Sequence, residues 1–303
     1  MSSMEAERTA ALFEEIRARG QKAIDAGLLE EAVGILQTAI DLAVQEGDAR
    51  QIDLTRCNYA AAMVEMGSGA SEISSLREVL VRNGDPASCR LAAYTIARYY
   101  ELTKNYKKAL FYARIAMDRS RLIGRRDWLA SSHNLIANTL MAESFVEPAC
   151  EEYERALRLM GDELSPNRAK IISNLGYCRV LQGRYVEAYR LLYEGLRLLR
   201  STTARWHEMI TRLDLCFAHL ETGRYRLAQR QGSAALAMAE SIGDVESIKN
   251  ALYLLGEAAN LSGDVETATA YFHRLQKEFF PTADYLPTFL LAVNIRKLVN
   301  LHA

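Results

Sequence analysis

The chain has 303 residues, of which 50% are hydrophobic and 25% charged, with a formal net charge of −1 and five prolines. This composition provides ample material for a helical core and leaves little room for disordered linkers. No run reaches the roughly 18 apolar residues of a membrane span. The N-terminal sequence Met-Ser-Ser-Met-Glu-Ala-Glu-Arg lacks the basic and apolar regions of a secretory signal. We therefore expect a cytoplasmic protein with no membrane partner.

The cysteines agree with this expectation. They are scattered along the chain without paired spacing, and several stand where a small packing residue is expected, which is typical of reduced thiols. The five are Cys57, Cys89, Cys150, Cys178 and Cys216.

From the N-terminus onward, a small residue recurs at nearly constant spacing. It lies at Ala32, Ile73, Ala109, Ala149, Ala188, Ala228 and Ala268, so that successive gaps are 41, 36, 40, 39, 40 and 40 residues. Four of these positions follow a glycine by five residues, at Gly27, Gly183, Gly223 and Gly263. A second, mostly small residue precedes each by twelve, at Gly20, Ala61, Ala97, Ala137, Gly176, Cys216 and Gly256. Self-similarity at a fixed period predicts a stacked array, here of seven units.

Each unit contains two segments with apolar spacing near 3.6, which predicts two amphipathic helices. The first helix ends near the glycine, the aromatic or aliphatic residue two places later fills the turn, and the second helix begins near the alanine. Small residues at the paired positions would let the two helices approach closely. Gly-Asp pairs occupy several turns between units, at Gly47-Asp48, Gly84-Asp85, Gly161-Asp162 and Gly243-Asp244.

The second unit fits the pattern least well. It has Ser68, Ala70, Ile73 and Arg77 where the other units favour glycine, tyrosine, alanine and an apolar residue. Either this unit is distorted, or Gly67-Ser-Gly69 is a hinge.

The last part of the chain interrupts the pattern at Pro281-Thr-Ala-Asp-Tyr-Leu-Pro287. An apolar helix is predicted over residues 288–301. We expect residues 1–280 to form one continuous array and residues 281–303 to form a helix that caps it, because a terminal repeat must cover its apolar face. The alternative is a docking helix for another domain.

The units resemble the tetratricopeptide repeat, whose motif places Leu-Gly in the first helix, Gly-x-Tyr at the turn and Ala in the second helix. The best match runs from Asn174 to Ala188, Asn-Leu-Gly-Tyr-Cys-Arg-Val-Leu-Gln-Gly-Arg-Tyr-Val-Glu-Ala. The resemblance covers nearly all of residues 10–280. The period near forty is longer than the usual 34 and is similar to that of kinesin light chains and bacterial Rap-type receptors. It implies an all-α, right-handed superhelical solenoid of about seven antiparallel helix pairs, but no particular function.

No motif for catalysis or cofactor binding accompanies the repeats. The chain lacks a dinucleotide-binding glycine motif, a phosphate loop, a His-Glu-x-x-His and a Gly-x-Ser-x-Gly. Cys216 and His219 could share one helix face, but two ligands do not make a metal site. We therefore expect no enzyme, no catalytic residue, no metal and no cofactor.

A basic cluster lies within the third unit and the turn after it. The chain as a whole is nearly neutral and carries no recognition motif for nucleic acid, so we expect a solvated face or, failing that, a contact for an acidic protein partner. Direct binding of nucleic acid is not expected. The cluster comprises Lys104, Lys107, Lys108, Arg114, Arg119, Arg121, Arg125 and Arg126.

The resemblance also implies a binding groove lined by the first helix of each unit. Asparagine can pair with both an amide and a carbonyl of an extended peptide, and aromatic side chains supply binding energy at low entropic cost. The carboxylate clamp of some relatives does not map, because only Asn138 and Asn174 stand at suitable places and Asn134 replaces its first lysine. The predicted peptide- or protein-binding residues are Tyr94, Arg98, Asn134, Asn138, Lys170, Ser173, Asn174, Tyr177, Leu213, Phe217, Asn250 and Tyr253, with Glu257 beside them.

Two hypotheses for function follow. The first is a non-enzymatic adaptor that binds a peptide or protein segment in this groove. The alternative is a regulatory sensor, either a receptor for a signalling peptide or the sensory part of a transcriptional regulator or kinase. The sequence does not name the partner, the pathway or the oligomeric state.

Overall fold

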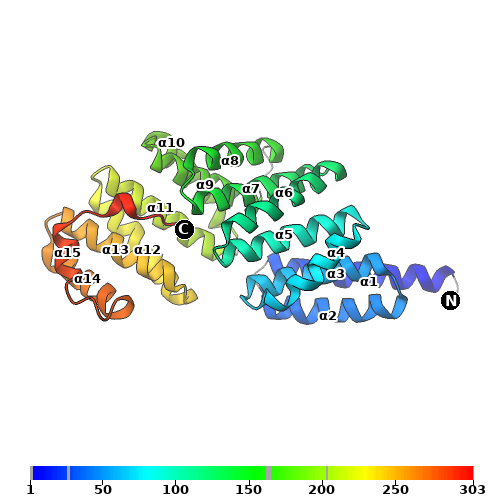
Figure 1. The fold of residues 1–303 in the computed structure, drawn as a ribbon. Coiled ribbons are helices and arrows are strands. Elements are labelled where there is room, and N and C mark those ends of the chain that lie inside the picture. The colour runs from blue at the N-terminus through cyan, green and yellow to red at the C-terminus, as the bar shows by residue number, and fades with distance from the viewer. Residues whose placement is uncertain (1–2, 26–27, 162–164, 203, 303) are drawn as a thin grey trace. The chain divides into compact units, whose positions relative to one another are not determined.

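A computed structural model describes residues 3–25, 28–161, 165–202 and 204–302, and within these ranges the chain is helical and contains no strand. Residue contacts divide it into two compact units (Figure 1). Unit 1 comprises Met1–Leu140 with Arg158–Met160, and unit 2 comprises Met141–Leu157 with Gly161–Ala303. The boundary between the units falls in the fourth repeat. That residues 1–280 form one continuous array stays a prediction.

Unit 1 contains the first three helix pairs and most of the next helix. Its elements are α1 (Ser3–Asp25), α2 (Leu29–Glu46), α3 (Ala49–Glu65), the 3-10 turn η1 (Gly69–Ser71), α4 (Glu72–Arg82), α5 (Pro86–Leu102), α6 (Tyr106–Ile123) and α7 (Arg126–Ala142).

Unit 2 contains most of α8, three further pairs and a short last helix. Its elements are α8 (Val146–Met160), α9 (Pro166–Leu181), α10 (Tyr185–Leu199), α11 (Arg205–Glu221), α12 (Tyr225–Ile242), α13 (Val245–Leu261), α14 (Val265–Phe279), α15 (Leu286–Ala292) and the 3-10 turn η2 (Arg296–Leu298). Helices α1 to α14 correspond in order to the two predicted helices of seven repeats, which confirms the all-α repeat architecture.

The predicted turn chemistry is present. Gly183 and Gly223 have φ of 72° and 69°, a left-handed conformation that glycine adopts without steric cost. Gly27 lies outside the described residues. The Gly243-Asp244 pair ends one helix and begins the next: Gly243 has φ of 79°, and the Asp244 carboxylate accepts the backbone N–H of Ser247 at 2.9 Å. At Gly84-Asp85 the left-handed residue is instead Asn83, with φ of 48°. Asp162 of the Gly161-Asp162 pair lies outside the described residues.

The small residues at the paired positions permit close packing of the helices. A Cβ atom added at Gly176 would lie 2.8 Å from Leu192, and one added at Gly256 would lie 2.3 Å from the Phe272 ring. Real Cβ atoms do not approach so closely, so these positions require glycine because of packing rather than chemistry.

The second repeat is distorted. After Gly67, whose φ is 77°, the 3-10 turn η1 precedes α4, which has only 11 residues. Gly69 is buried, and a Cβ there would lie 2.3 Å from the Val64 side chain. The segment is therefore a tightly packed turn.

The helix predicted over residues 288–301 is wrong beyond Ala292. Helix α15 ends there, and Val293 is extended, with φ of −121° and ψ of 122°. The Asn260 side chain donates a hydrogen bond of 3.1 Å to the Leu291 carbonyl and so satisfies a group at the helix end. Helix α15 packs against α13 and α14, with Pro287 and Leu290 buried. The rest of the predicted helix follows a different path, which defines the site below.

Candidate functional site

The segment Val293–His302, here called the tail, runs back along unit 2. Figure 1 shows it in red, leading from α15 past α11 towards the C-terminal label. Within unit 2, α11 packs against both α9 and α13. The tail contacts these three helices and Met141, which lies at the end of α7 and belongs to unit 2.

The tail begins with a charged contact to α11 and α13. The Arg296 guanidinium donates to the Leu220 carbonyl at 3.4 Å and lies 3.5 Å from Glu221 and 3.6 Å from Glu257. Glu257 is almost completely buried, and burial raises its pKa while Arg296 lowers it. The charge of Arg296 therefore offsets part of the cost of burying this carboxylate.

Further along, the amide of Asn300 binds the turn after α7. Its Nδ2 donates to the Met141 carbonyl at 2.9 Å and to the Ser144 hydroxyl at 3.1 Å. Ser144 has φ of 64°, although it occupies the place in its repeat where other repeats have glycine. A carbonyl at a helix end and a residue in the left-handed region thus both serve the contact with the tail.

The next residue is held by its main chain. The Leu301 N–H donates to the Tyr177 hydroxyl at 3.0 Å, and the Leu301 side chain is buried. Tyr177 itself is fully buried on α9, and burial raises its pKa. A hydrogen bond from a backbone amide to a fixed hydroxyl holds an extended chain without selecting its side chain.

His302 makes two contacts at once. Its ring stacks on Tyr177 with centroids 4.2 Å apart and planes 7° from parallel, and its Nε2 lies 2.9 Å from Asp214 Oδ1. Asp214 lies on α11 and is completely buried, and its Oδ2 has no hydrogen-bond partner among the described residues. Burial raises the pKa of Asp214, whereas the His302 imidazole lowers it. The residues that contact the tail form what we call the tail-binding face: Met141, Ser144, Tyr177, Asp214, Leu220, Glu221 and Glu257.

Several predicted site residues of unit 2 lie on or under this face. Tyr177 contacts the tail directly, and the centroid of the Phe217 ring lies 6.3 Å from that of the Tyr177 ring. Leu213 and Tyr253 are buried. Ser173 is buried beside Gly195. Lys170, Asn174 and Asn250 are half-buried on α9 and α13, and their role stays a prediction.

The remaining predicted residues belong to unit 1. Arg98 bridges Glu65 at 2.8 Å and Glu101 at 2.7 Å. Tyr94 is half-buried, with the Arg90 guanidinium 4.5 Å above its ring. Asn134 and Asn138 are half-buried on α7, and the Oδ1 of Asn134 has no partner among the described residues. A role of these four residues in peptide binding stays a prediction.

Sequence reasoning missed Asp214, Ser144 and the tail. Asp214 carried a signal, since it is the one charged residue in the apolar run Leu213-Asp-Leu-Cys-Phe217. Ser144 carried a weaker one, because it replaces the glycine of its repeat. His302 and Asn300 gave none, since their contacts depend on the chain leaving the helix at Ala292.

The basic cluster is partly paired within unit 1. Arg121 bonds Asp118 at 3.0 Å, Arg125 bonds Asp127, and Lys108 lies 5.1 Å from the Tyr100 ring centroid. These contacts are typical of a surface with mixed charges, and a role in partner binding stays a prediction.

The cysteines are unpaired and buried, as expected from their spacing. Cys216 is completely buried, and burial raises its pKa to about 12. His219 instead bonds Tyr193 at 3.0 Å and stacks on Tyr189. These two residues therefore serve in packing. Among the described residues, no helix is both long enough and apolar enough to cross a membrane.

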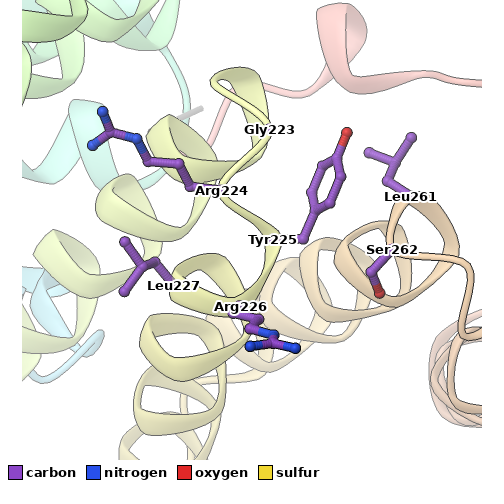
Figure 2. Close-up of a pocket in the computed structure, with 7 residues that line it drawn as sticks. All are labelled: Gly223, Arg224, Tyr225, Arg226, Leu227, Leu261 and Ser262. Carbon is purple, nitrogen blue, oxygen red and sulfur yellow. The ribbon is translucent and has the colours of Figure 1, made fainter.

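A separate open pocket lies at the turn between α11 and α12 (Figure 2). It is formed by Gly223 to Leu227 together with Leu261 and Ser262. Figure 2 shows the Tyr225 ring beside Leu261, which is the turn-filling role that the repeat pattern predicts. None of the predicted site residues lines it.

No family profile and no curated protein matches the chain. Solved structures do. A Rap protein complexed with Competence and Sporulation Factor superposes with a TM-score of 0.71 at 12% identity, covering 94% of this chain and 80% of that one. The apo quorum sensor NprR from B. thuringiensis gives 0.69 at 17%, covering 91% and 80%. The type IV pilus biogenesis factor PilW gives 0.60 at 20%, covering 79% and 99%. The chain therefore has a fold of the tetratricopeptide-repeat type.

Proposed function

We propose that this chain is a non-enzymatic interaction protein whose tail-binding face in unit 2 holds an extended peptide. The observation that carries the proposal is the tail itself. On this face, the Tyr177 hydroxyl accepts a backbone N–H of the tail, Met141 and Ser144 accept its side-chain amide, and Asp214 bonds its imidazole ring. A surface that recognises an extended segment of its own chain in this way is suited to a similar segment of another.

A regulatory sensor is the second candidate. Its support is the similarity to NprR, which is a quorum sensor, and to the Rap protein, whose structure contains Competence and Sporulation Factor. Both candidates place a peptide on a helical repeat. They differ in whether binding changes the overall dimensions of the helical repeat, and solution scattering with and without peptide distinguishes them.

Direct binding requires a face that the tail does not occupy. We would use the full chain with Asn300→Ala and His302→Ala, here called the tail-weakened variant, and a fluorescently labelled synthetic peptide of residues 293–302. Fluorescence anisotropy should show saturable binding. In the same background, Tyr177→Phe with Asp214→Asn removes the hydroxyl that accepts the backbone N–H and the negative charge that accepts from the ring, with little change in volume. It should weaken binding by about tenfold or more.

A matched control is Tyr189→Phe. Tyr189 belongs to the same unit, and its hydroxyl bonds the Ala218 carbonyl at 2.9 Å, but it does not contact the tail. This variant should bind the peptide as tightly as the tail-weakened variant. Absence of saturable binding, or equal binding after the Tyr177 and Asp214 changes, would overturn the proposal.

A further inference from the structure

The environment of Asp214 goes beyond general peptide holding. A carboxylate in an apolar environment is costly unless it is paired. Asp214 is 0% exposed on α11. Its Oδ1 bonds His302 of the tail, while Oδ2 has no partner among the described residues. The folded helices thus leave this carboxylate to be satisfied by whatever occupies the face.

The space beside Asp214 favours a flat group. His302 lies nearly parallel to Tyr177, at 7° and 4.2 Å, while its Nε2 reaches Asp214 Oδ1. An imidazole or a guanidinium can stack on the phenol ring and donate to the carboxylate at once. An aliphatic side chain could do neither, and an ammonium could make only the second contact well.

Among the described residues, most polar contacts of the tail come from a few positions. Leu298 is 84% exposed and Val293 41% exposed, so neither contributes much apolar burial. The contacts are concentrated at Arg296 and at Asn300, Leu301 and His302. A segment held at so few points can be replaced by another that offers the same groups, although its covalent attachment gives it a high effective concentration.

We propose, resting on the function proposed above, that the tail competes with a partner peptide for the tail-binding face. The partner is an extended segment that carries a side-chain amide and, two residues later, an imidazole or guanidinium that binds the Asp214 carboxylate. The amide binds the Met141 carbonyl, the intervening main chain binds Tyr177, and the flat donor lies between Tyr177 and Asp214. Binding of the partner releases the tail.

The test uses three labelled synthetic peptides of residues 293–302: the native sequence, one with His302→Ala and one with His302→Arg. Each peptide is titrated with three full-length proteins: the wild type, the tail-weakened variant and a control with Leu298→Ala, which alters an exposed tail residue. We expect the native peptide to bind the tail-weakened variant about a hundredfold more tightly than it binds the wild type, because the competitor is lost. Leu298→Ala should bind like the wild type.

On the tail-weakened variant, the peptide with alanine should bind about tenfold more weakly than the native peptide, and the peptide with arginine should bind more tightly than the one with alanine. Equal affinity of the wild type and the tail-weakened variant would show that the tail does not compete. Equal affinity of the native and alanine peptides would show that Asp214 does not contribute to recognition of the side chain at position 302 of the peptide. In both cases the peptide still binds and the proposed function stands, whereas failure of every peptide to bind the tail-weakened variant would overturn both proposals.

Discussion

Replacement of Ser144 by glycine separates the stability of a turn from its contact with the tail. Ser144 has φ of 64°, and Lys104 has φ of 57° at the equivalent place of the preceding repeat. A left-handed conformation costs an ordinary residue about 1–2 kcal/mol. Glycine removes this cost but adds roughly 0.4–1 kcal/mol of chain entropy to the unfolded state. The net backbone contribution at either position is a gain of about 0.5–1 kcal/mol in the free energy of unfolding.

Ser144 differs from Lys104 because its hydroxyl also accepts the Asn300 amide at 3.1 Å. Loss of this exposed hydrogen bond costs about 0.5–1 kcal/mol, so Ser144→Gly in the wild type should change the free energy of unfolding very little. In the Asn300→Ala background the bond is already absent, and the full gain should appear. Lys104→Gly should give the same gain in both backgrounds.

The assay is urea unfolding of the wild type, the three single variants and the two double variants, followed by circular dichroism, with comparison of midpoints at equal slope. The reasoning is refuted if Ser144→Gly has the same effect with and without Asn300, since the turn would then not be coupled to the tail. It is also refuted if either glycine variant is destabilised by more than about 1 kcal/mol, since the left-handed conformation would then carry no strain.

Two further predictions concern packing and pH. Gly256→Ala should lower the free energy of unfolding by about 1–3 kcal/mol because its Cβ would meet the Phe272 ring. As a control, Gly34→Ala in α2, where a Cβ meets nothing within 4 Å, should raise the free energy of unfolding by about 0.5–1 kcal/mol. Thermal unfolding of both variants and the wild type measures the difference. Burial first, and then Arg224 and Arg230, lower the pKa of His219 from 6.5 to about 4. The folded state therefore binds fewer protons than the unfolded state in this range, and the free energy of unfolding should fall by about 2 kcal/mol from pH 7.5 to 5; urea titrations that show the same fall in His219→Gln would contradict this assignment.

The repeat architecture was predictable from the sequence because packing and turn chemistry leave local signals. Gly176 and Gly256 recur at a fixed offset since a Cβ there would meet the neighbouring helix, and Gly183 recurs since its turn requires a positive φ. Each requirement acts within a single repeat, so a period in the sequence displays it directly.

The site was only partly predictable. Tyr177 was predicted as a site residue from its place in the repeat, and its hydroxyl accepts the Leu301 N–H of the tail; its role in binding a partner stays a prediction. The tail was missed because residues 293–302 have an apolar pattern compatible with a helix, and long-range contacts override it: Arg296 reaches α11 and α13, Asn300 reaches the turn after α7, and His302 reaches Asp214. No local pattern encodes contacts between residues that are 39 to 159 positions apart.

The most direct measurement of the central claim is hydrogen exchange of the Leu301 amide in the full chain, which donates to the Tyr177 hydroxyl at 3.0 Å. We expect this amide to exchange at least about tenfold more slowly than in the free peptide of residues 293–302, and to lose most of that protection in Tyr177→Phe but not in the control Tyr189→Phe. Exchange at the rate of the free peptide in the wild-type chain would show that the tail does not lie on the tail-binding face, and would contradict the account.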